Sequence, residues 1–169
     1  MTTDGGSSAG KKKRQLPTRE QLGVWRDYFE TAQVLRSRLA GRLQIQASLS
    51  MGDYEVLLTL SEAEANRLRS SELAAGMAWE RSRLSHHLGR MEKRGLIRRE
   101  ECPEDSRGAD VVLSEAGAQA FRSGSVPHLQ AIRELFLDAL SPEQLLQLAG
   151  IVDSLRAHLE PVDVGPAGG

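Results

Sequence analysis

A basic amphipathic segment that leads directly into two short β-prone runs is the feature that most constrains how this chain can fold. Apolar residues at helical spacing predict a helix from Trp79 to Lys93, and Arg94-Gly95 gives a stop signal at its end. The β-prone runs 96–100 and 111–113 flank a polar segment with Pro and Gly, which predicts a hairpin. A helix followed at once by a hairpin indicates a helix-turn-helix with the hairpin as its wing.

Two further helical segments precede the basic one. Residues 50–60 place Tyr54 and three leucines on one side of a helix. Residues 70–76 start with two serines, which favour a helix N-terminus, and end at a glycine, which favours a C-terminus. The short helix before the basic helix is typical of a helix-turn-helix, with the basic helix in the recognition position.

Long amphipathic segments lie on both sides of this region. The first opens at Thr18, a good N-cap, and carries one apolar stripe from Leu22 to Leu43. The second includes a helix capped by Ser141 with Pro142 at its first position. These apolar stripes are longer than a small domain needs to cover its own core, so we expect a partner helix to cover the rest of each stripe. We therefore predict that a second copy of the chain packs on Leu22, Phe29, Leu35, Leu39, Leu148, Ile151 and Leu155.

The composition favours a mainly α protein with a small β-hairpin wing. Aromatic residues make up only 4% of the 169 residues, and Leu and Ala supply most of the apolar content. The single cysteine excludes an internal disulfide, and no leader or long apolar run occurs, so we expect a soluble cytoplasmic protein without a membrane partner. The expected divisions are a disordered basic tail (1–17), an N-terminal dimerisation helix (18–46), the winged helix-turn-helix (47–117), C-terminal dimerisation helices (118–160) and a flexible tail (161–169).

The charge is unevenly distributed along the chain, although the formal net charge is only -1. Residues 81–99 hold seven basic residues and one acid, whereas residues 108–169 hold three arginines and eight acids. A local excess of positive charge favours an anionic partner on one part of the molecule. Beside a helix-turn-helix pattern this predicts double-stranded DNA as the partner; the alternative is an ordinary solvated basic face.

Helical geometry divides the basic helix into an inner and an outer face. At about 100° per residue, Leu84, Leu88 and Met91 share the inner face, and His87 lies near its edge. The outer face offers donors for phosphates and base edges, and arginine can bond guanine in the major groove. Gly89, in the middle of this face, leaves room for a close approach of DNA. We predict DNA contacts from Ser82, Arg83, Ser85, His86, Arg90 and Lys93.

The segment between the two β-prone runs carries three residues of interest. Asp105 and Arg107 are two apart, so both can project from one side of an extended tip. An arginine in this place can enter the minor groove; the alternative is a surface ion pair worth less than about 1 kcal/mol. Cys102 has no second cysteine to resolve an oxidised form, so we interpret it as incidental and not as a redox sensor.

The chain resembles the multiple-antibiotic-resistance regulator (MarR) family over residues 18–160. Three motifs carry the resemblance: a helix end, a D-x-R wing and a return motif, which read Glu92-Lys93-Arg94-Gly95-Leu96, Asp105-Ser106-Arg107 and Val111-Val112-Leu113-Ser114-Glu115-Ala116-Gly117. The resemblance implies a DNA-binding transcriptional regulator whose terminal helices intertwine in a homodimer and hold two winged domains on a pseudo-palindromic operator. We expect a repressor, and activation is the alternative. It assigns recognition and wing roles to Ser82, Arg83, Ser85, His86, Arg90, Asp105 and Arg107. The adjacent His86 and His87 depart from the usual family pattern, which leaves the preferred bases open.

The resemblance also implies a small phenolic or anionic effector. In the family such a molecule binds between the dimer helices and the winged domain and weakens DNA binding by favouring another spacing of the two recognition helices. Trp25, Tyr28 and Tyr54 are the aromatic candidates for this pocket. The alternative is that all three are core residues.

The sequence contains no motif for an enzyme, a cofactor or a metal site. It lacks a Gly-rich phosphate loop, G-x-S-x-G and H-E-x-x-H, so we name no catalytic residue. The four histidines lack metal-ligand spacing, and we expect His128 and His158 at an interface. The competing interpretation is a winged-helix module for protein interaction or architecture, without operator specificity.

Overall fold

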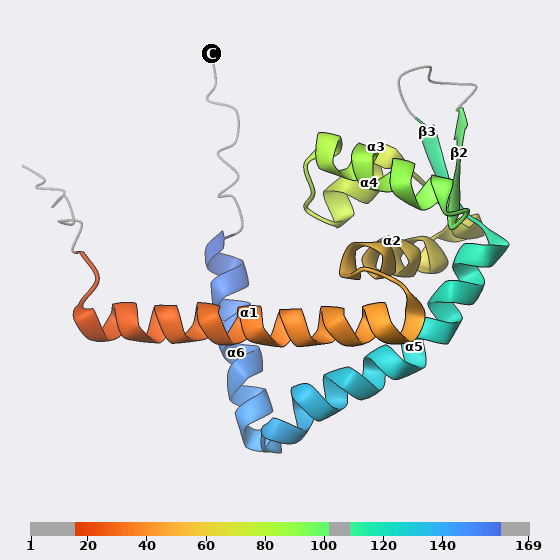
Figure 1. Ribbon diagram of the computed structural model, residues 1–169. Helices are drawn as coiled ribbons and strands as arrows, with labels where there is room; N and C mark the ends of the chain where they lie inside the picture. Colours follow the sequence, from red (N-terminus) through yellow and green to blue (C-terminus); the bar gives the residue numbers. More distant parts are fainter. Residues whose placement is uncertain (1–15, 102–108, 160–169) are drawn as a thin grey trace, which may run out of the picture. The chain divides into compact units, whose positions relative to one another are not determined.

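The computed structural model describes residues 16–101 and 109–159 (Figure 1). The tails within 1–15 and 160–169, and the wing residues Cys102, Asp105 and Arg107, lie outside this part of the chain. In chain order the elements are α1 (Arg19–Ala47), α2 (Met51–Glu62), η1 (Glu64–Asn66), β1 (Arg67–Arg69), α3 (Ser70–Gly76), α4 (Arg81–Lys93), β2 (Ile97–Glu101), β3 (Ala109–Leu113), α5 (Glu115–Leu135), η2 (Leu137–Ala139) and α6 (Pro142–Leu159). Over the described ranges, no helix combines the length and the apolar character needed to cross a bilayer.

The chain divides into two compact units, Met1–Val34 and Leu35–Gly169. The first holds the N-terminal part of α1, and the second holds the C-terminal part of α1 and every later element. The predicted boundaries of the helix-turn-helix region, 47 and 117, fall at the end of α1 and inside the first turn of α5. The described part of the chain is mainly helical with one small sheet, so the predicted fold class is confirmed.

In the described part of the chain, four hydroxyl side chains cap the starts of helices. Each hydroxyl accepts a hydrogen bond from the backbone N–H three residues later, which satisfies a donor that the first turn would leave unpaired. The predicted caps at Thr18 and Ser141 are among them and are confirmed. The N···O distances are 3.2 Å for Gln21 and Thr18, 3.1 Å for Asp53 and Ser50, 2.9 Å for Gly117 and Ser114, and 3.2 Å for Gln144 and Ser141.

Three short strands form an antiparallel sheet in the order β1-β3-β2. β2 and β3 are the predicted hairpin, with Ile97 opposite Leu113. A third strand, β1, was not predicted; it pairs with the other edge of β3. β1 consists of three residues, two of them arginines, so it has no β-prone pattern of its own and becomes a strand only through its pairing.

The core of the second unit is built from leucines of the helix-turn-helix and of the end of α1. In Figure 1, α3 and α4 lie beside each other, next to β2 and β3, and α2 contacts the sheet and α5. Tyr54, Leu57 and Leu60 of α2 are buried as predicted, whereas Leu58 is only half-buried. The largest fully buried side chains are Leu43, Leu49, Leu57, Leu60, Leu73, Leu84, Leu88, Met91, Ile97, Val56 and Val111.

The return motif docks the start of α5 on the turn that follows α4. The Ser114 hydroxyl donates to the Gly95 carbonyl at 2.6 Å and also caps α5. Gly117 packs so close to this turn that a Cβ atom there would overlap the carbonyl oxygen of Leu96. Two motif residues of the sequence therefore have a packing role, and they set where α5 leaves the sheet.

Apolar side chains remain exposed on α1 and α6. In the first unit, Trp25 and Phe29 have ring centroids 5.0 Å apart and are 58% and 47% exposed. In the second unit, α6 has no buried residue, and Ile151 and Leu155 are 57% and 47% exposed. Exposed apolar faces of this kind are typical of interaction surfaces.

Candidate nucleic-acid interface

α4 begins at Arg81, two residues later than predicted. Ala78, just before it, has a φ of 51°, which an α-helix does not allow, and the Trp79 N–H bonds back to the Ala74 carbonyl at 3.0 Å. The predicted start at Trp79 is therefore wrong. Glu80 precedes the helix without a capping side chain, so the sequence carries no strong start signal at this place.

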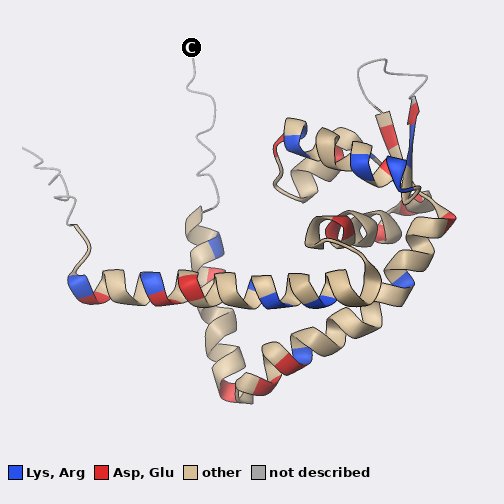
Figure 2. Cartoon of the chain, viewed as in Figure 1, with Lys and Arg blue, Asp and Glu red and all other residues tan. Residues whose placement is uncertain are grey.

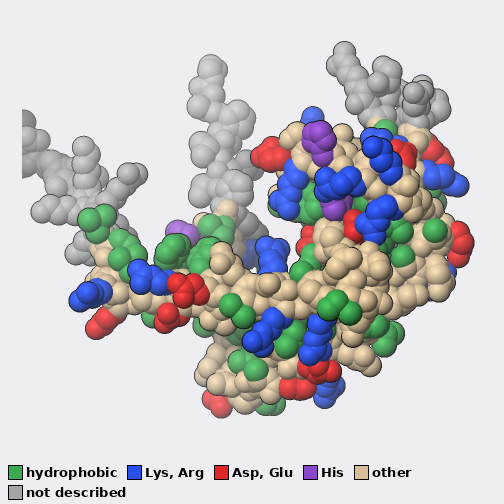
Figure 3. All heavy atoms as spheres, viewed as in Figure 1, with side chains coloured by type: hydrophobic (Ala, Val, Ile, Leu, Met, Phe, Trp, Pro, Cys, Tyr) green, Lys and Arg blue, Asp and Glu red, His purple; other side chains and the backbone are tan. Residues whose placement is uncertain are grey.

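The rotation of α4 places its polar residues outward. Leu84, His87, Leu88 and Met91 are buried against the core, as expected for the inner face. The outer residues form what we call the outer face of α4, which Figure 3 shows as a gathering of basic and histidine side chains. Its exposed residues are Ser82, Arg83, Ser85, His86, Arg90 and Lys93.

Gly89 opens the middle of this outer face. A Cβ atom at Gly89 would meet nothing within 4 Å, so packing inside the chain does not demand a glycine. Glycine in a helix interior costs about 0.5–1 kcal/mol relative to alanine. Its place between Ser85 and Lys93 gives a partner room to approach the helix backbone closely.

Figure 2 shows Lys and Arg in α4 and β2. Ion pairs take up part of this basic cluster in residues 81–99. Glu92 accepts from Nε and Nη2 of Arg99 at 2.8 and 2.6 Å, and these hydrogen bonds lower the pKa of Glu92. Arg98 lies 3.7 Å from Glu100. The sequence count of positive charge therefore overstates the charge offered to a partner, because pairing is set by the fold and not by composition.

Arg94, the arginine of the helix-end motif, links three elements. Its Nη1 donates to Oδ2 of Asp53 at 2.6 Å, and its Nη2 donates to the Ser48 carbonyl at 2.6 Å. Ser48 follows α1, and Asp53 lies in the first turn of α2. Arg94 therefore ties the end of α4 to the junction between α1 and α2, which is a structural role.

Asp53 is the buried anion of this region. Burial by itself would raise its pKa, but the close approach of His87 and hydrogen bonds with Ser50 and Arg94 outweigh that effect and hold the pKa far below its ordinary value of 3.8. The Ser50 N–H donates to Oδ2 of Asp53 at 2.9 Å. A carboxylate with these partners stays ionised and fixes the start of α2 against α4.

His87 stands between Asp53 and the outer face. Its Nε2 lies 3.1 Å from Oδ1 of Asp53, and its Nδ1 lies 3.0 Å from Nη2 of Arg90. The imidazole also meets the edge of the Trp79 ring, with centroids 5.2 Å apart. The Arg83 guanidinium lies 4.1 Å from the Trp79 ring centroid, a cation–π contact.

Sequence reasoning did not identify Asp53, His87 and Trp79 as supports of the outer face. One signal was present: His87 falls on the inner side of α4, where a polar ring needs a partner. The partner could not be named, because Asp53 lies 34 positions earlier and meets His87 only through the packing of α2 on α4.

The three aromatic candidates for an effector pocket lie in different surroundings. Trp25 and Tyr28 belong to the first unit and are 58% and 57% exposed. Tyr54 is a core residue of the second unit, in ring contact with Phe121 at 5.3 Å and with His128 at 4.5 Å. Tyr54 therefore packs against two rings of α5.

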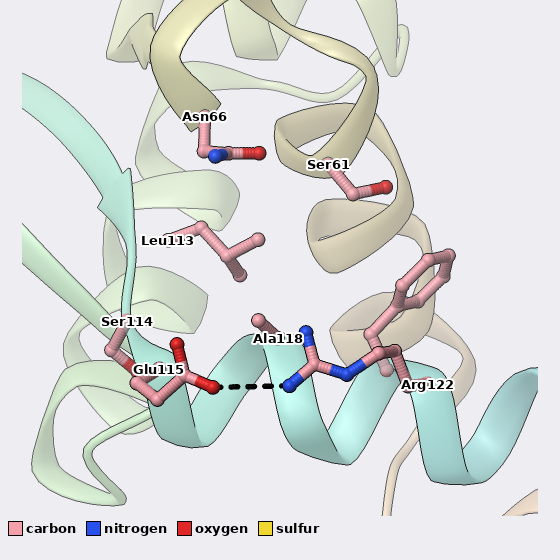
Figure 4. Close-up of a pocket in the computed structure, with 8 residues that line it drawn as sticks. Ser61, Asn66, Leu113, Ser114, Glu115, Ala118 and Arg122 are labelled. Carbon is pink, nitrogen blue, oxygen red and sulfur yellow. Dashed lines mark hydrogen bonds and ion pairs between the residues drawn. The ribbon is translucent and has the colours of Figure 1, made fainter.

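A cavity of about 340 Å³ opens between the end of α2 and the start of α5 (Figure 4). The Glu115–Arg122 ion pair, at 3.0 Å, bridges two of its lining residues, and Leu113 points into it from β3. Tyr54 does not line it, although its ring partner Phe121 does. The lining residues are Ser61, Asn66, Leu113, Ser114, Glu115, Ala118, Phe121 and Arg122.

The histidines occupy separate places. His86 is exposed on α4, and His158 is exposed on α6. His128 is buried inside the second unit, and burial lowers its pKa, so the expectation of an interfacial His128 is wrong. The packing of α5 on α2 brings the His128 ring against Tyr54, a contact that periodicity in α5 alone does not reveal. Within residues 16–101 and 109–159, no group of three potential metal ligands comes together.

Comparison with known proteins places these features in a family. Residues 49–108 match the model of the MarR family. The structure of AbsC, a MarR family transcriptional regulator from Streptomyces coelicolor, is similar with a TM-score of 0.79 and 38% identity, covering 86% of this chain and 97% of AbsC. Sco3205, a MarR family transcriptional regulator from the same organism solved in complex with DNA, has a TM-score of 0.83 and 37% identity, covering 90% of this chain and 95% of its own.

A third relative is the transcriptional repressor MprA of Escherichia coli (strain K12). It is 28% identical over 110 residues, which are 65% of this chain and 62% of MprA, so the chain spans less than two thirds of that protein. All three relatives are transcriptional regulators and not enzymes. With identity above one third across nearly the whole of two solved regulators, this chain belongs to the MarR family of transcriptional regulators.

Proposed function

We propose that this protein is a sequence-specific double-stranded DNA-binding regulator that reads its site with the outer face of α4. The observation that carries the proposal is that this face is exposed and polar, while the opposite face of the same helix is buried in the core. The strand β2, which pairs with β3 in the hairpin, contacts α4. Sco3205, a relative at 37% identity, was solved with DNA bound.

The proposed contacts divide into two kinds. Lys93 and the hydroxyls of Ser82 and Ser85 suit phosphates, which set the position of the protein on the duplex. Arg83, His86 and Arg90 carry donors that suit base edges in the major groove. In the wing, Asp105 and Arg107 keep their proposed role at the minor groove.

A homodimer is part of the proposal. The exposed apolar residues of α1 and α6 form faces that a second copy would cover, and they include most of the predicted contact residues. Leu35, Leu39 and Leu148 are half-buried, whereas Leu22, Phe29, Ile151 and Leu155 are exposed. A two-fold dimer would carry two α4 helices and therefore bind a pseudo-palindromic operator.

We further propose that the protein acts as a repressor and that a small phenolic or anionic effector releases it. MprA, a relative at 28% identity, is named a transcriptional repressor. In the proposal, residues 18–46 and 118–160 are the dimerisation helices on either side of the DNA-binding region, and Trp25, Tyr28 and Tyr54 remain the aromatic candidates for effector binding. An effector that favours another spacing of the two α4 helices would weaken operator binding.

Selection from a pool of random-sequence duplexes tests the proposal. We expect the purified protein to enrich an inverted repeat, and unlabelled bulk DNA should compete weakly against it. Salt dependence alone would not decide, because any ionic interface weakens with salt. Uniform weak retention of all duplexes would contradict sequence-specific regulation and favour the interaction or architectural module.

A further inference from the structure

The partners of His87 determine which of its ring nitrogens carries a proton. A guanidinium has only donors, so Nδ1 accepts from Arg90 and carries no proton. An ionised carboxylate has only acceptors, so the proton belongs on Nε2, which faces Asp53. A proton on Nε2 therefore leaves Nδ1 free to accept from Arg90 and directs an N–H toward Asp53, whose Oδ1 lies 3.1 Å away but outside hydrogen-bond geometry. The other tautomer would place an N–H against the Arg90 guanidinium.

This contact restrains a side chain that belongs to the outer face. Arg90 is exposed, and within the described ranges no ion pair joins it to an acid. A long exposed side chain loses rotamer entropy on binding, and this cost falls when the group is already held in place. One bond to His87 leaves the other guanidinium donors free for a DNA partner.

The position of His87 is itself enforced by packing. A Cβ atom on Gly52 of α2 would lie 3.1 Å from Cε1 of His87 and 2.7 Å from Cη2 of Trp79. Gly52 therefore leaves the space that the two rings occupy. Asp53, the next residue, supplies the carboxylate behind the imidazole. The start of α2 thus provides both the space for the His87 ring and the carboxylate beside it.

We propose that His87 is a positioning residue for Arg90, holding the guanidinium through Nδ1 in the orientation that reads one base pair of the operator. The inference rests on the proposed DNA-binding function of α4. It adds to that function a buried residue that does not itself touch DNA but sets base preference through Arg90.

Two substitutions separate the roles of the two ring nitrogens. His87→Gln keeps a polar group near the place of Nε2, toward Asp53, and removes the acceptor for Arg90. His87→Asn keeps an acceptor near the place of Nδ1 and gives up the contact with Asp53. The measurement is the affinity of the full-length protein for the selected duplex and for duplexes changed at single base pairs. Arg90→Ala identifies the base pair that Arg90 reads.

We expect His87→Gln to lower discrimination at that base pair by about tenfold, the scale of a lost bidentate arginine contact, and His87→Asn to retain most of it. Adding Arg90→Ala to His87→Gln should then change little, because the two substitutions remove the same interaction. Gly52→Ala crowds the ring without removing a polar group and should lower discrimination in the same direction.

Imidazole ¹⁵N shifts of the free protein give a second readout that needs no DNA. They should show an unprotonated Nδ1 and a protonated Nε2 on His87, and the opposite tautomer would overturn the proposal. Unchanged discrimination in His87→Gln would also overturn it. A third contrary result is that His87→Gln weakens binding of every duplex equally while Arg90→Ala keeps its full effect in that background, because this pattern indicates a packing role. If the unsubstituted protein selects no sequence, the proposed function fails and the base-reading role falls with it.

Discussion

Asp53 accepts hydrogen bonds that hold the start of α2 to the end of α4. Its side chain is 4% exposed and receives bonds from a backbone N–H and from Arg94. Since the folded-state pKa lies below the ordinary value of 3.8, the ionised carboxylate stabilises the fold fully above that pH. The contribution is lost as the pH falls from there toward the folded-state pKa.

Replacing Asp53 by asparagine tests this assignment. We expect the free energy of unfolding at pH 7 to fall by about 2 kcal/mol, less than a fully buried pair because Arg94 is partly exposed to solvent. Denaturant unfolding at several pH values should show the difference from the unsubstituted protein shrinking as the pH drops below 4. Asp153→Asn, which removes an exposed ion pair on α6, is the control and should leave the unfolding curve nearly unchanged.

Gly89→Ala separates stability from binding on the outer face. We expect the unfolding free energy to rise by about 0.5–1 kcal/mol, since the added Cβ meets nothing within the chain and alanine favours the helix. DNA affinity should fall, because the methyl group would occupy space that a closely approaching duplex needs. Thermal unfolding and duplex titrations measure the two effects. Gly41→Ala, at another open helical position, should stabilise the protein without the loss in affinity; equal affinities for both variants would argue against close approach at Gly89.

At the scale of elements, the contact between α5 and the turn after α4 decides how the C-terminal helices leave the winged domain. Ser114 reaches the Gly95 carbonyl, and Gly117 lies against Leu96. The left-handed φ of 73° at Gly95 lets the chain turn sharply from α4 into β2. The motifs that identify the family in this chain therefore include residues that join elements as well as residues for which we propose contact with DNA.

Gly117→Ala should disrupt this junction. The new Cβ would overlap the backbone oxygen of Leu96, which is not the end of a flexible side chain, so α5 or the turn must shift. We expect a loss of about 1–3 kcal/mol in unfolding free energy, in the range of overpacked cores. Denaturant midpoints compared with those of Gly41→Ala measure the difference. A Gly117→Ala protein as stable as that control would refute the packing role.

At the scale of the whole molecule, the exposed apolar residues of α1 and α6 require a partner if the protein is to act on an operator with two-fold symmetry. We expect Leu35→Glu combined with Leu155→Glu to convert a dimer into monomers and to abolish tight binding of a full site. Sedimentation and duplex titration would follow the two changes together. Glu143→Lys alters the charge at the start of α6 without removing an apolar side chain and should keep both properties. A monomer that still binds a full site tightly would contradict the proposal.

Sequence alone determined the features that repeat with a local period. The inward placement of Leu84, Leu88 and Met91, and the outward placement of the opposite residues, follow from 3.6 residues per turn. The caps at Thr18 and Ser141 and the hairpin of β2 and β3 likewise depend on neighbours in the chain.

Only the tertiary structure decided the contacts between residues far apart in the sequence. β1 is a strand because it pairs with the free edge of β3. Arg94 is not part of the outer face because its guanidinium binds Asp53. The link from Asp53 through His87 to Arg90 depends on the space that Gly52 leaves between α2 and α4. Such contacts leave no repeating pattern in the sequence, because they form only when helices and strands pack together in the folded protein.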